Sequence, residues 1–189
     1  MNARKVLLAG LSLGLGLAAL AAVPAMAALQ PGAKAPDFTA QASLGGKVYT
    51  FSLKDALKKG PVVLYFYPAA FTPGCTIEAH EFADAMDDFK KLHATVIGVS
   101  RDPIDKLNKF SVSECRSKFP VAADTDGKIT EAYDAVLTFP GRPQSVSNRT
   151  SYVIGQDGKV IYDYTSLDPS KHVENTMTAV KTWDSSHSR

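Results

Sequence analysis

The sequence is poor in the residues that hold metal ions or crosslink small domains. Its 189 residues include two cysteines, one tryptophan and four histidines. Cys75 and Cys115 lie too far apart for a C-x-x-C redox motif, and neither they nor the histidines show the paired spacing of zinc ligands. The sequence therefore predicts no metal site, and it leaves open whether the two cysteines form a structural disulfide.

A large excess of charge of one sign is also missing. The chain has 21 Lys and Arg residues against 19 Asp and Glu residues. Two of the cations, Arg4 and Lys5, belong to the first five residues, so the rest of the chain carries 19 charges of each sign. We therefore expect neither nucleic acid nor an anionic membrane surface as the main partner, because both attract a concentrated basic field.

Only one hydrophobic run is long enough to concern a membrane, and it lies at the N-terminus. Residues 6–23 are nearly all apolar, follow a basic segment and precede the small residues Ala25 and Ala27. This pattern predicts a secretory signal peptide over residues 1–27, and hence an exported, periplasmic protein with no stable membrane association after cleavage. Residues 28–189 would then form a single domain. The alternative is an uncleaved anchor, since about 18 apolar residues reach the lower limit for spanning a bilayer.

Strand and helix patterns alternate along the rest of the chain. An unbroken apolar run over residues 62–67 predicts a central strand covered on both faces. Apolar spacings of three and four over residues 73–92 predict an amphipathic helix. Asp102 and Pro103 predict the N-cap and first position of another helix, running to about residue 118. Further strands are expected at residues 48–51, 95–99, 121–123, 151–154 and 160–164, and further helices from residue 52, at 128–135 and after residue 168. This order predicts an α/β, thioredoxin-like fold, a mixed central sheet with helices on both faces.

The segment before the long helix places one cysteine in a reactive position. Thr72 and Pro73 suit the N-cap and first helical position, so Cys75 falls at the third position of the first turn. There the sulfur faces free backbone N–H groups and the positive end of the helix dipole, which favour the thiolate. Becoming mostly thiolate at neutral pH requires about 3.4 kcal/mol, and the dipole contributes at most about 2 kcal/mol. Arg149, just before a predicted strand, could supply the remainder if the sheet brings it to the same end; otherwise it is a solvated loop charge.

The pattern P-x-x-x-T-x-x-C, formed by Pro68, Thr72 and Cys75, resembles the active-site loop of the peroxiredoxins. The wider segment Y-F-Y-P-x-x-F-T-P-G-C-T-x-E is similar to the PrxQ or bacterioferritin-comigratory-protein branch of that family. Flanking agreement at residues 98–102 and 148–154 extends the resemblance over essentially the whole predicted domain.

This resemblance implies a thiol peroxidase that needs no metal or organic cofactor. Cys75 would be the peroxidatic cysteine, which attacks a hydroperoxide and becomes a sulfenic acid. Arg149, the Thr72 hydroxyl and the Cys75 backbone N–H would act as donors to the reacting atoms, while Pro68 would shield the sulfur and Glu78 would help to hold the hydrogen bonds of the site. The implied partners are a hydroperoxide and a thioredoxin-like protein reductant, and the implied assembly is a monomer or weak homodimer.

The resolving cysteine is the point at which the sequence departs from many PrxQ enzymes. The position five residues after Cys75, where they carry that cysteine, is His80. Other members carry it on the following helix, where we expect Cys115, so the resemblance suggests that Cys115 resolves the sulfenic acid. Two alternatives stay open. Cys115 could be an inert buried thiol in a one-cysteine peroxidase recycled by an external thiol, or the chain could be a non-catalytic thioredoxin-like module with a permanent Cys75–Cys115 bridge.

Overall fold

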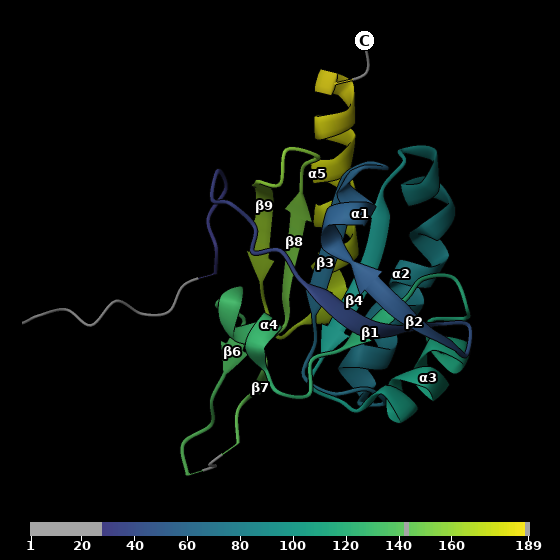
Figure 1. Cartoon of the computed structure of the whole chain (residues 1–189), viewed down its shortest axis with the longest axis vertical. Coiled ribbons are helices and arrows are strands. Elements are labelled where there is room, and N and C mark those ends of the chain that lie inside the picture. The colour runs from purple at the N-terminus through teal and green to yellow at the C-terminus, as the bar shows by residue number, and fades with distance from the viewer. Residues whose placement is uncertain (1–27, 142–143, 188–189) are drawn as a thin grey trace, which may run out of the picture.

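The structure is a computed structural model that describes residues 28–141 and 144–187 (Figure 1). The predicted signal peptide, residues 1–27, lies outside the described residues. The strands are β1 (Thr39–Leu44), β2 (Lys47–Ser52), β3 (Val62–Phe66), β4 (Thr95–Ser100), β5 (Val121–Ala123), β6 (Val136–Leu137), β7 (Val146–Ser147), β8 (Thr150–Ile154) and β9 (Val160–Thr165). The helices are α1 (Leu53–Leu57), α2 (Pro73–Lys91), α3 (Ile104–Ser113), α4 (Lys128–Ala132) and α5 (His172–His187), the last preceded by a 3₁₀ turn, η1 (Pro169–Lys171).

One mixed sheet organises these elements. Its strand order is β2-β1-β5-β4-β3-β8-β9, while β6 and β7 form a separate two-stranded ladder. Strand β4 runs parallel to β3 and β5, whereas β8 runs antiparallel to both β3 and β9. Helices α2, α3 and α5 cover one face of the sheet, and α1 and α4 cover the other (Figure 1). The predicted mixed sheet with helices on both faces is confirmed.

The unbroken apolar run of the central strand follows from this two-sided burial. Val63 and Tyr65 of β3 point into the core beneath α2, α3 and α5. Leu64 and Phe66 point into the core beneath α1 and α4. Every residue of β3 is buried, so neither face could carry the polar residues that mark a half-exposed strand.

The turn between β1 and β2 shows why two consecutive glycines stand there. Gly45 and Gly46 have φ values of 55° and 81°, in the left-handed region that glycine enters without steric cost. Ser52, at the end of β2, then accepts a hydrogen bond from the Asp55 N–H and caps α1, as the sequence predicted. Among the residues that the structure describes, no helix is long and apolar enough to cross a membrane.

The predicted N-cap role of Asp102 was wrong. Pro103 occupies the N-cap position of α3, which has no side-chain cap. The Asp102 carboxylate instead accepts hydrogen bonds from the Ala70 N–H at 2.7 Å and from Lys106 Nζ at 2.7 Å. The carboxylate therefore holds the loop that follows β3, and this contact between distant segments takes the place of the local cap.

The predicted extent of α3 was also wrong, with a consequence for Cys115. The helix ends at Ser113 and not near residue 118, so Cys115 lies in the turn after the helix. Arg116 and Ser117 have φ values of 49° and 56°. Two successive left-handed residues cannot continue a right-handed helix, and the chain turns there toward β5.

Candidate active site

The loop between β3 and α2 carries Cys75 into the interior. Pro68 is half-buried two residues after the end of β3, and Phe71 has a left-handed φ of 67°. Helix α2 begins at Pro73, so Cys75 stands at its third position, as predicted, and is only 1% exposed. The first helical bond joins the Thr76 N–H to the Thr72 carbonyl at 2.9 Å. The Cys75 N–H precedes that bond and has no acceptor within the helix, as is general for a first turn.

Thr72 lies at the N-cap but does not cap the helix with its side chain. Its backbone is extended, as an N-cap residue requires, and its hydroxyl donates to the Ala69 carbonyl at 2.9 Å. The predicted side-chain cap was therefore wrong, because the local turn takes up the hydroxyl. Thr72 is exposed, so its hydroxyl lies at the surface of the loop that leads to the sulfur.

Arg149 lies beside Cys75, as the resemblance implied and as its position before a strand left open. The antiparallel register of β3 and β8 pairs Phe66 with Thr150, so the start of β8 and the end of β3 meet at one edge of the sheet. The Arg149 Nη2 atom lies 3.5 Å from the Cys75 sulfur. Arg149 is 4% exposed, which excludes the alternative of a solvated loop charge.

Gly74 makes room for this arginine. A Cβ atom at position 74 would lie 3.0 Å from Arg149 Nη2, closer than ordinary van der Waals contact. Any side chain there would press against the guanidinium that faces the sulfur. The glycine in the T-P-G-C segment therefore has a packing role that the sequence analysis did not predict.

Glu78 and a backbone carbonyl hold the guanidinium in this orientation. Glu78 lies one turn after Cys75 on α2, is fully buried, and pairs through Oε2 with Arg149 Nη1. Burial raises the pKa of Glu78, and the Arg149 guanidinium opposes that rise by favouring the carboxylate. On the other side of the arginine, Nε donates to the Leu167 carbonyl at 3.0 Å. Arg149 thus contacts the sulfur while two separate elements restrain it.

Before the structure, only the resemblance gave Glu78 a role at the site, since a first-turn anion also has an ordinary helical explanation. The sequence nevertheless contained a signal that Glu78 belongs to the site. Cys75 and Glu78 are three residues apart and therefore share a helix face. An acidic residue on the same buried face as a cysteine needs a cationic partner, and Arg149 is that partner.

Cys115 is a buried free thiol on the same side of the sheet. Cys75 and Cys115 are both unbridged and belong to one apolar cluster, together with Tyr65 and Tyr67. Burial raises the pKa of Cys115 well above that of an ordinary thiol. Cys115 is therefore protonated at neutral pH.

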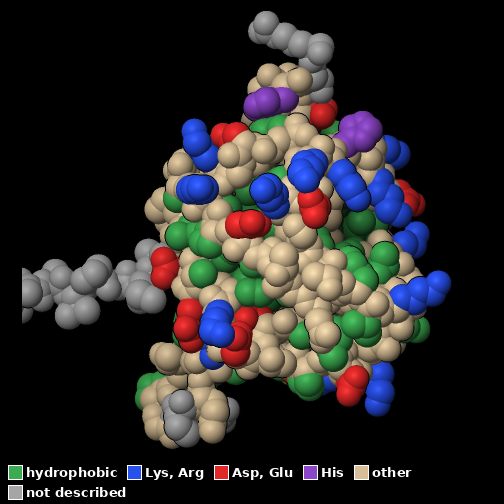
Figure 2. All heavy atoms as spheres, viewed as in Figure 1, with side chains coloured by type: hydrophobic (Ala, Val, Ile, Leu, Met, Phe, Trp, Pro, Cys, Tyr) green, Lys and Arg blue, Asp and Glu red, His purple; other side chains and the backbone are tan. Residues whose placement is uncertain are grey.

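One group of surface lysines lies away from the Cys75 site. Figure 2 shows several lysine and arginine side chains in the upper half of one face. Lys34, Lys54 and Lys58 line a common groove with residues of α1. Helix α1 precedes β3, so this groove lies at the opposite end of the sheet from the end of β3. The cation that faces Cys75 is therefore the buried Arg149 and not the surface lysines.

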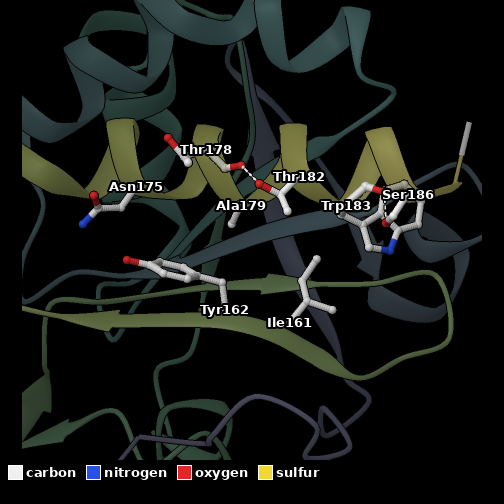
Figure 3. A pocket seen from close by; sticks show the side chains of 8 residues that line it. All are labelled: Ile161, Tyr162, Asn175, Thr178, Ala179, Thr182, Trp183 and Ser186. Atoms are coloured by element: carbon white, nitrogen blue, oxygen red, sulfur yellow. Dashed lines mark hydrogen bonds between the residues drawn. The ribbon is translucent and has the colours of Figure 1, made fainter.

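Besides the Cys75 site, a groove or a group of metal-binding side chains could mark a functional site. A groove of about 440 Å³ lies between α5 and β9, lined among others by Tyr162 and Trp183 (Figure 3). Three of its lining residues, Ile161, Tyr162 and Ala179, pack against the outside of the apolar cluster that contains Cys75. Within residues 28–141 and 144–187, no group of three His, Cys, Asp or Glu side chains could hold a metal ion.

The fold and the site together define a thiol enzyme: a mixed α/β sheet presents a buried cysteine at a helix N-terminus, beside a buried arginine. The pattern of the AhpC/TSA family matches residues 31–163. The chain belongs to this family.

Its relatives identify the branch. The Bacillus subtilis peroxiredoxin Bcp is 32% identical over 155 residues, covering 81% of this chain and 96% of the relative. The crystal structure of the peroxidoxin BcpB from Mycobacterium tuberculosis is 31% identical, with a TM-score of 0.73, and covers 82% of this chain and 97% of that one. A structure of the Xanthomonas campestris bacterioferritin comigratory protein, described for its alkyl peroxide reduction activity, is 26% identical, with a TM-score of 0.68 and coverage of 76% and 91%.

These matches confirm the predicted thioredoxin-like fold and the resemblance to the Bcp and PrxQ peroxiredoxins. They also confirm that the chain is an enzyme of peroxiredoxin type. Thiol-dependent reduction of peroxides, with re-reduction by thioredoxin-like proteins, is general for this family.

Proposed function

We propose that Cys75 is the peroxidatic cysteine and Cys115 the resolving cysteine of an exported, thioredoxin-recycled peroxidase. The Cys75 thiolate attacks the terminal oxygen of a hydroperoxide, the O–O bond breaks, and an alkoxide or hydroxide leaves and takes up a proton. The sulfur retains the attacked oxygen as a sulfenic acid. The Cys115 sulfur then attacks the Cys75 sulfur, which forms a disulfide and releases water. A dithiol protein reduces that disulfide and is itself oxidised.

The contact between Arg149 and Cys75 is the observation that carries this proposal. A guanidinium 3.5 Å from the sulfur stabilises the thiolate before the reaction and faces the negative charge that develops on the peroxide oxygens during it. The pairing with Glu78 and the Leu167 carbonyl fixes the guanidinium in advance, so little reorganisation is needed at the transition state. The free Cys75 N–H supplies a second donor in the same turn.

Exposed apolar residues beside the site support organic hydroperoxides, as well as hydrogen peroxide, as substrates. Phe71, Ile77 and Leu167 are 45%, 49% and 57% exposed. Each adjoins or contacts a residue of the proposed active site. Phe71 precedes Thr72, Ile77 precedes Glu78, and the Leu167 carbonyl accepts a hydrogen bond from Arg149. Such residues offer contact area to an alkyl chain, and the alkyl peroxide reduction described for the Xanthomonas campestris relative agrees with this assignment.

The first test is to treat the reduced protein with one equivalent of peroxide and to identify the products by mass spectrometry. The proposed function predicts loss of both thiols and one Cys75–Cys115 disulfide. A sulfenic acid that persists on Cys75 would favour the one-cysteine alternative. A reaction no faster than that of free cysteine would contradict the proposed function and favour the non-catalytic module. The same measurement on protein recovered from cells reports whether residues 1–27 have been removed.

Replacing Arg149 with methionine is expected to slow the reaction with peroxide by about 10²-fold or more, the usual cost of losing one such donor. The pH midpoint of thiolate formation by Cys75 should rise as well. Thiolate absorbance against pH and stopped-flow peroxide kinetics check the two effects. Unchanged values for both would show that Arg149 does not stabilise the thiolate.

The matched control for this variant addresses Glu78. Arg149→Met leaves a fully buried carboxylate without its cation, which commonly costs about 3–5 kcal/mol of stability. A double variant, Arg149→Met with Glu78→Gln, removes the buried carboxylate together with the guanidinium. It should regain stability without regaining the peroxide rate, and recovery of the rate would attribute the defect to unfolding.

Replacing Thr72 with valine is expected to lower the peroxide rate by on the order of 10²-fold, while stability changes little because the hydroxyl makes no cap bond. The hydroxyl would have to turn from the Ala69 carbonyl toward the bound peroxide. Thr72→Ser keeps the hydroxyl and should retain most of the rate in the same stopped-flow assay. A Thr72→Val rate within a factor of about two of wild type would remove Thr72 from the mechanism.

A further inference from the structure

His172 is a buried titratable residue to which the proposed mechanism gives no part. It is the first residue of α5 and is 0% exposed. Its Nδ1 atom lies 3.6 Å from Glu78 Oε1 and 2.8 Å from Ser151 Oγ. The Glu78 oxygen that faces it has no hydrogen-bond partner among the described residues, so the imidazole is the polar group that Glu78 meets on the side away from Arg149.

The hydrogen bonds of His172 define its tautomer. Nε2 lies 2.9 Å from the Ser166 carbonyl, and a carbonyl only accepts, so Nε2 carries the proton. Nδ1 then accepts from the Ser151 hydroxyl. Burial, with a smaller contribution from Arg149, lowers the pKa of His172 to about 4, so the ring is neutral at physiological pH. The groups around the ring are Glu78, Arg149, Ser151, the Tyr164 ring, the Ser166 carbonyl and Asp168.

Two paths lead from His172 to the guanidinium of Arg149. One is a packing contact with Glu78: His172 Nδ1 lies 3.6 Å from Glu78 Oε1 without a hydrogen bond, and Glu78 Oε2 pairs with Arg149. The second passes through the backbone after β9. His172 binds the Ser166 carbonyl, the Ser166 N–H donates to the Arg149 carbonyl at 3.1 Å, and the next carbonyl, that of Leu167, accepts from Arg149 Nε.

We propose that His172 is a positioning residue for the peroxidatic site: it holds the residue 166–167 backbone by a hydrogen bond and packs against Glu78, and through these contacts it aims Arg149 at Cys75. It touches neither the sulfur nor a reacting oxygen. Loss of the Nε2 donor releases the Ser166 carbonyl, and with it the backbone that presents the Leu167 carbonyl to Arg149. This inference rests on the proposed function of Cys75 and Arg149.

The test compares three variants in a Cys115→Ser background, where the thiolate signal comes from Cys75. His172→Phe keeps a ring of similar size and removes both nitrogens. His172→Gln keeps a donor near the position of Nε2. Thr176→Val is the matched control: Thr176 is buried on the next turn of α5 and its hydroxyl bonds the His172 carbonyl, so this change disturbs the same helix without touching either path. Thermal unfolding, the pH midpoint of thiolate absorbance and the peroxide rate are measured for each.

Groups that orient an active residue commonly contribute about 10- to 100-fold, as shown for the partners of metal ligands. We expect His172→Phe to raise the thiolate midpoint and to slow the peroxide reaction about tenfold, with partial recovery in His172→Gln. Thr176→Val should lose stability but keep the thiolate midpoint and the peroxide rate of the Cys115→Ser background. If His172→Phe does not fold, His172→Gln provides the test. A smaller rise of the thiolate midpoint is then expected.

Two results would overturn the proposal. One is an unchanged midpoint and rate in folded His172 variants. The other is an equal shift in Thr176→Val, which would indicate general loosening of α5. The thiolate titration uses no peroxide, so it tests the positioning role even if the wild-type protein failed to reduce peroxide, a failure that would refute the proposed function alone.

Discussion

Cys75→Ser is expected to abolish peroxide reduction and to leave the fold intact. The sulfur is the atom proposed to attack the O–O bond, and a serine hydroxyl is not ionised at neutral pH, so the rate should fall by at least on the order of 10³-fold. The fold should persist because α2 is not capped by Cys75. The smaller serine side chain fits the buried site, and its hydroxyl can accept from the Arg149 guanidinium, which lies beside the sulfur.

The measurement is peroxide consumption by the reduced variant, with thermal unfolding to confirm that it folds. Cys115→Ser serves as the matched control, because it also removes one buried thiol but leaves Cys75 to react. In the first turnover, Cys115→Ser should therefore consume peroxide and Cys75→Ser should not. Substantial peroxide consumption by folded Cys75→Ser would refute the central assignment of this site.

Much of the fold could be predicted because its signals are local. The apolar run of β3 and the helical spacing of α2 each report the burial of one element. The place of Cys75 in the first turn follows from Thr72 and Pro73 alone. The two-residue strands β6 and β7 were not predicted, because a ladder that short has no detectable period.

The errors and omissions at the site have a different origin. Asp102 was expected to cap a helix, but it binds the Ala70 N–H, 32 residues away in the sequence. Glu78 and His172 were not expected to meet, because they lie on different helices and only the packed fold brings them together. Arg149 could be placed near Cys75 only by assuming how β8 pairs with β3. Local pattern thus locates the reactive cysteine, whereas the groups that surround it depend on the sheet topology.

The segment that carries Cys115 is held in a way that permits release. Arg116 and Ser117 are left-handed, a conformation that costs about 1–3 kcal/mol at each non-glycine residue. Two ion pairs dock the segment on α2, Asp84 with Arg116 and Asp87 with Lys118 at 4.0 Å, and the His80 ring contacts Glu114 at 2.9 Å. Exposed pairs of this kind contribute about 0–1 kcal/mol each. The strain of these two residues, about 2–6 kcal/mol in total, exceeds what such pairs contribute, so burial of Cys115 and Phe119 is the main restraint.

Ring packing couples this segment to the loop that precedes Cys75. Phe71 packs edge-on against Phe110 with ring centroids 5.2 Å apart, and the Phe110 carbonyl accepts the Cys115 N–H at 3.0 Å. Oxidation of Cys75 adds a hydroxyl to a buried, largely apolar cluster, which is unfavourable without new hydrogen bonds. We therefore expect oxidation to loosen both segments together. A disulfide requires the two Cα atoms to come within about 7 Å.

Cys115→Ser is accordingly expected to consume one equivalent of peroxide at the wild-type rate and then to stall as a sulfenic acid. Turnover with a thioredoxin-like reductant should be lost, and over-oxidation to the sulfinic acid should increase, because no internal thiol removes the intermediate. Coupled reductant oxidation and mass spectrometry of Cys75 check these results. Cys115→Ala should behave in the same way without placing a hydroxyl at a fully buried position. Normal turnover in both variants would make Cys115 a bystander, and the loosely held 114–118 segment would then need another explanation than delivery of the resolving sulfur.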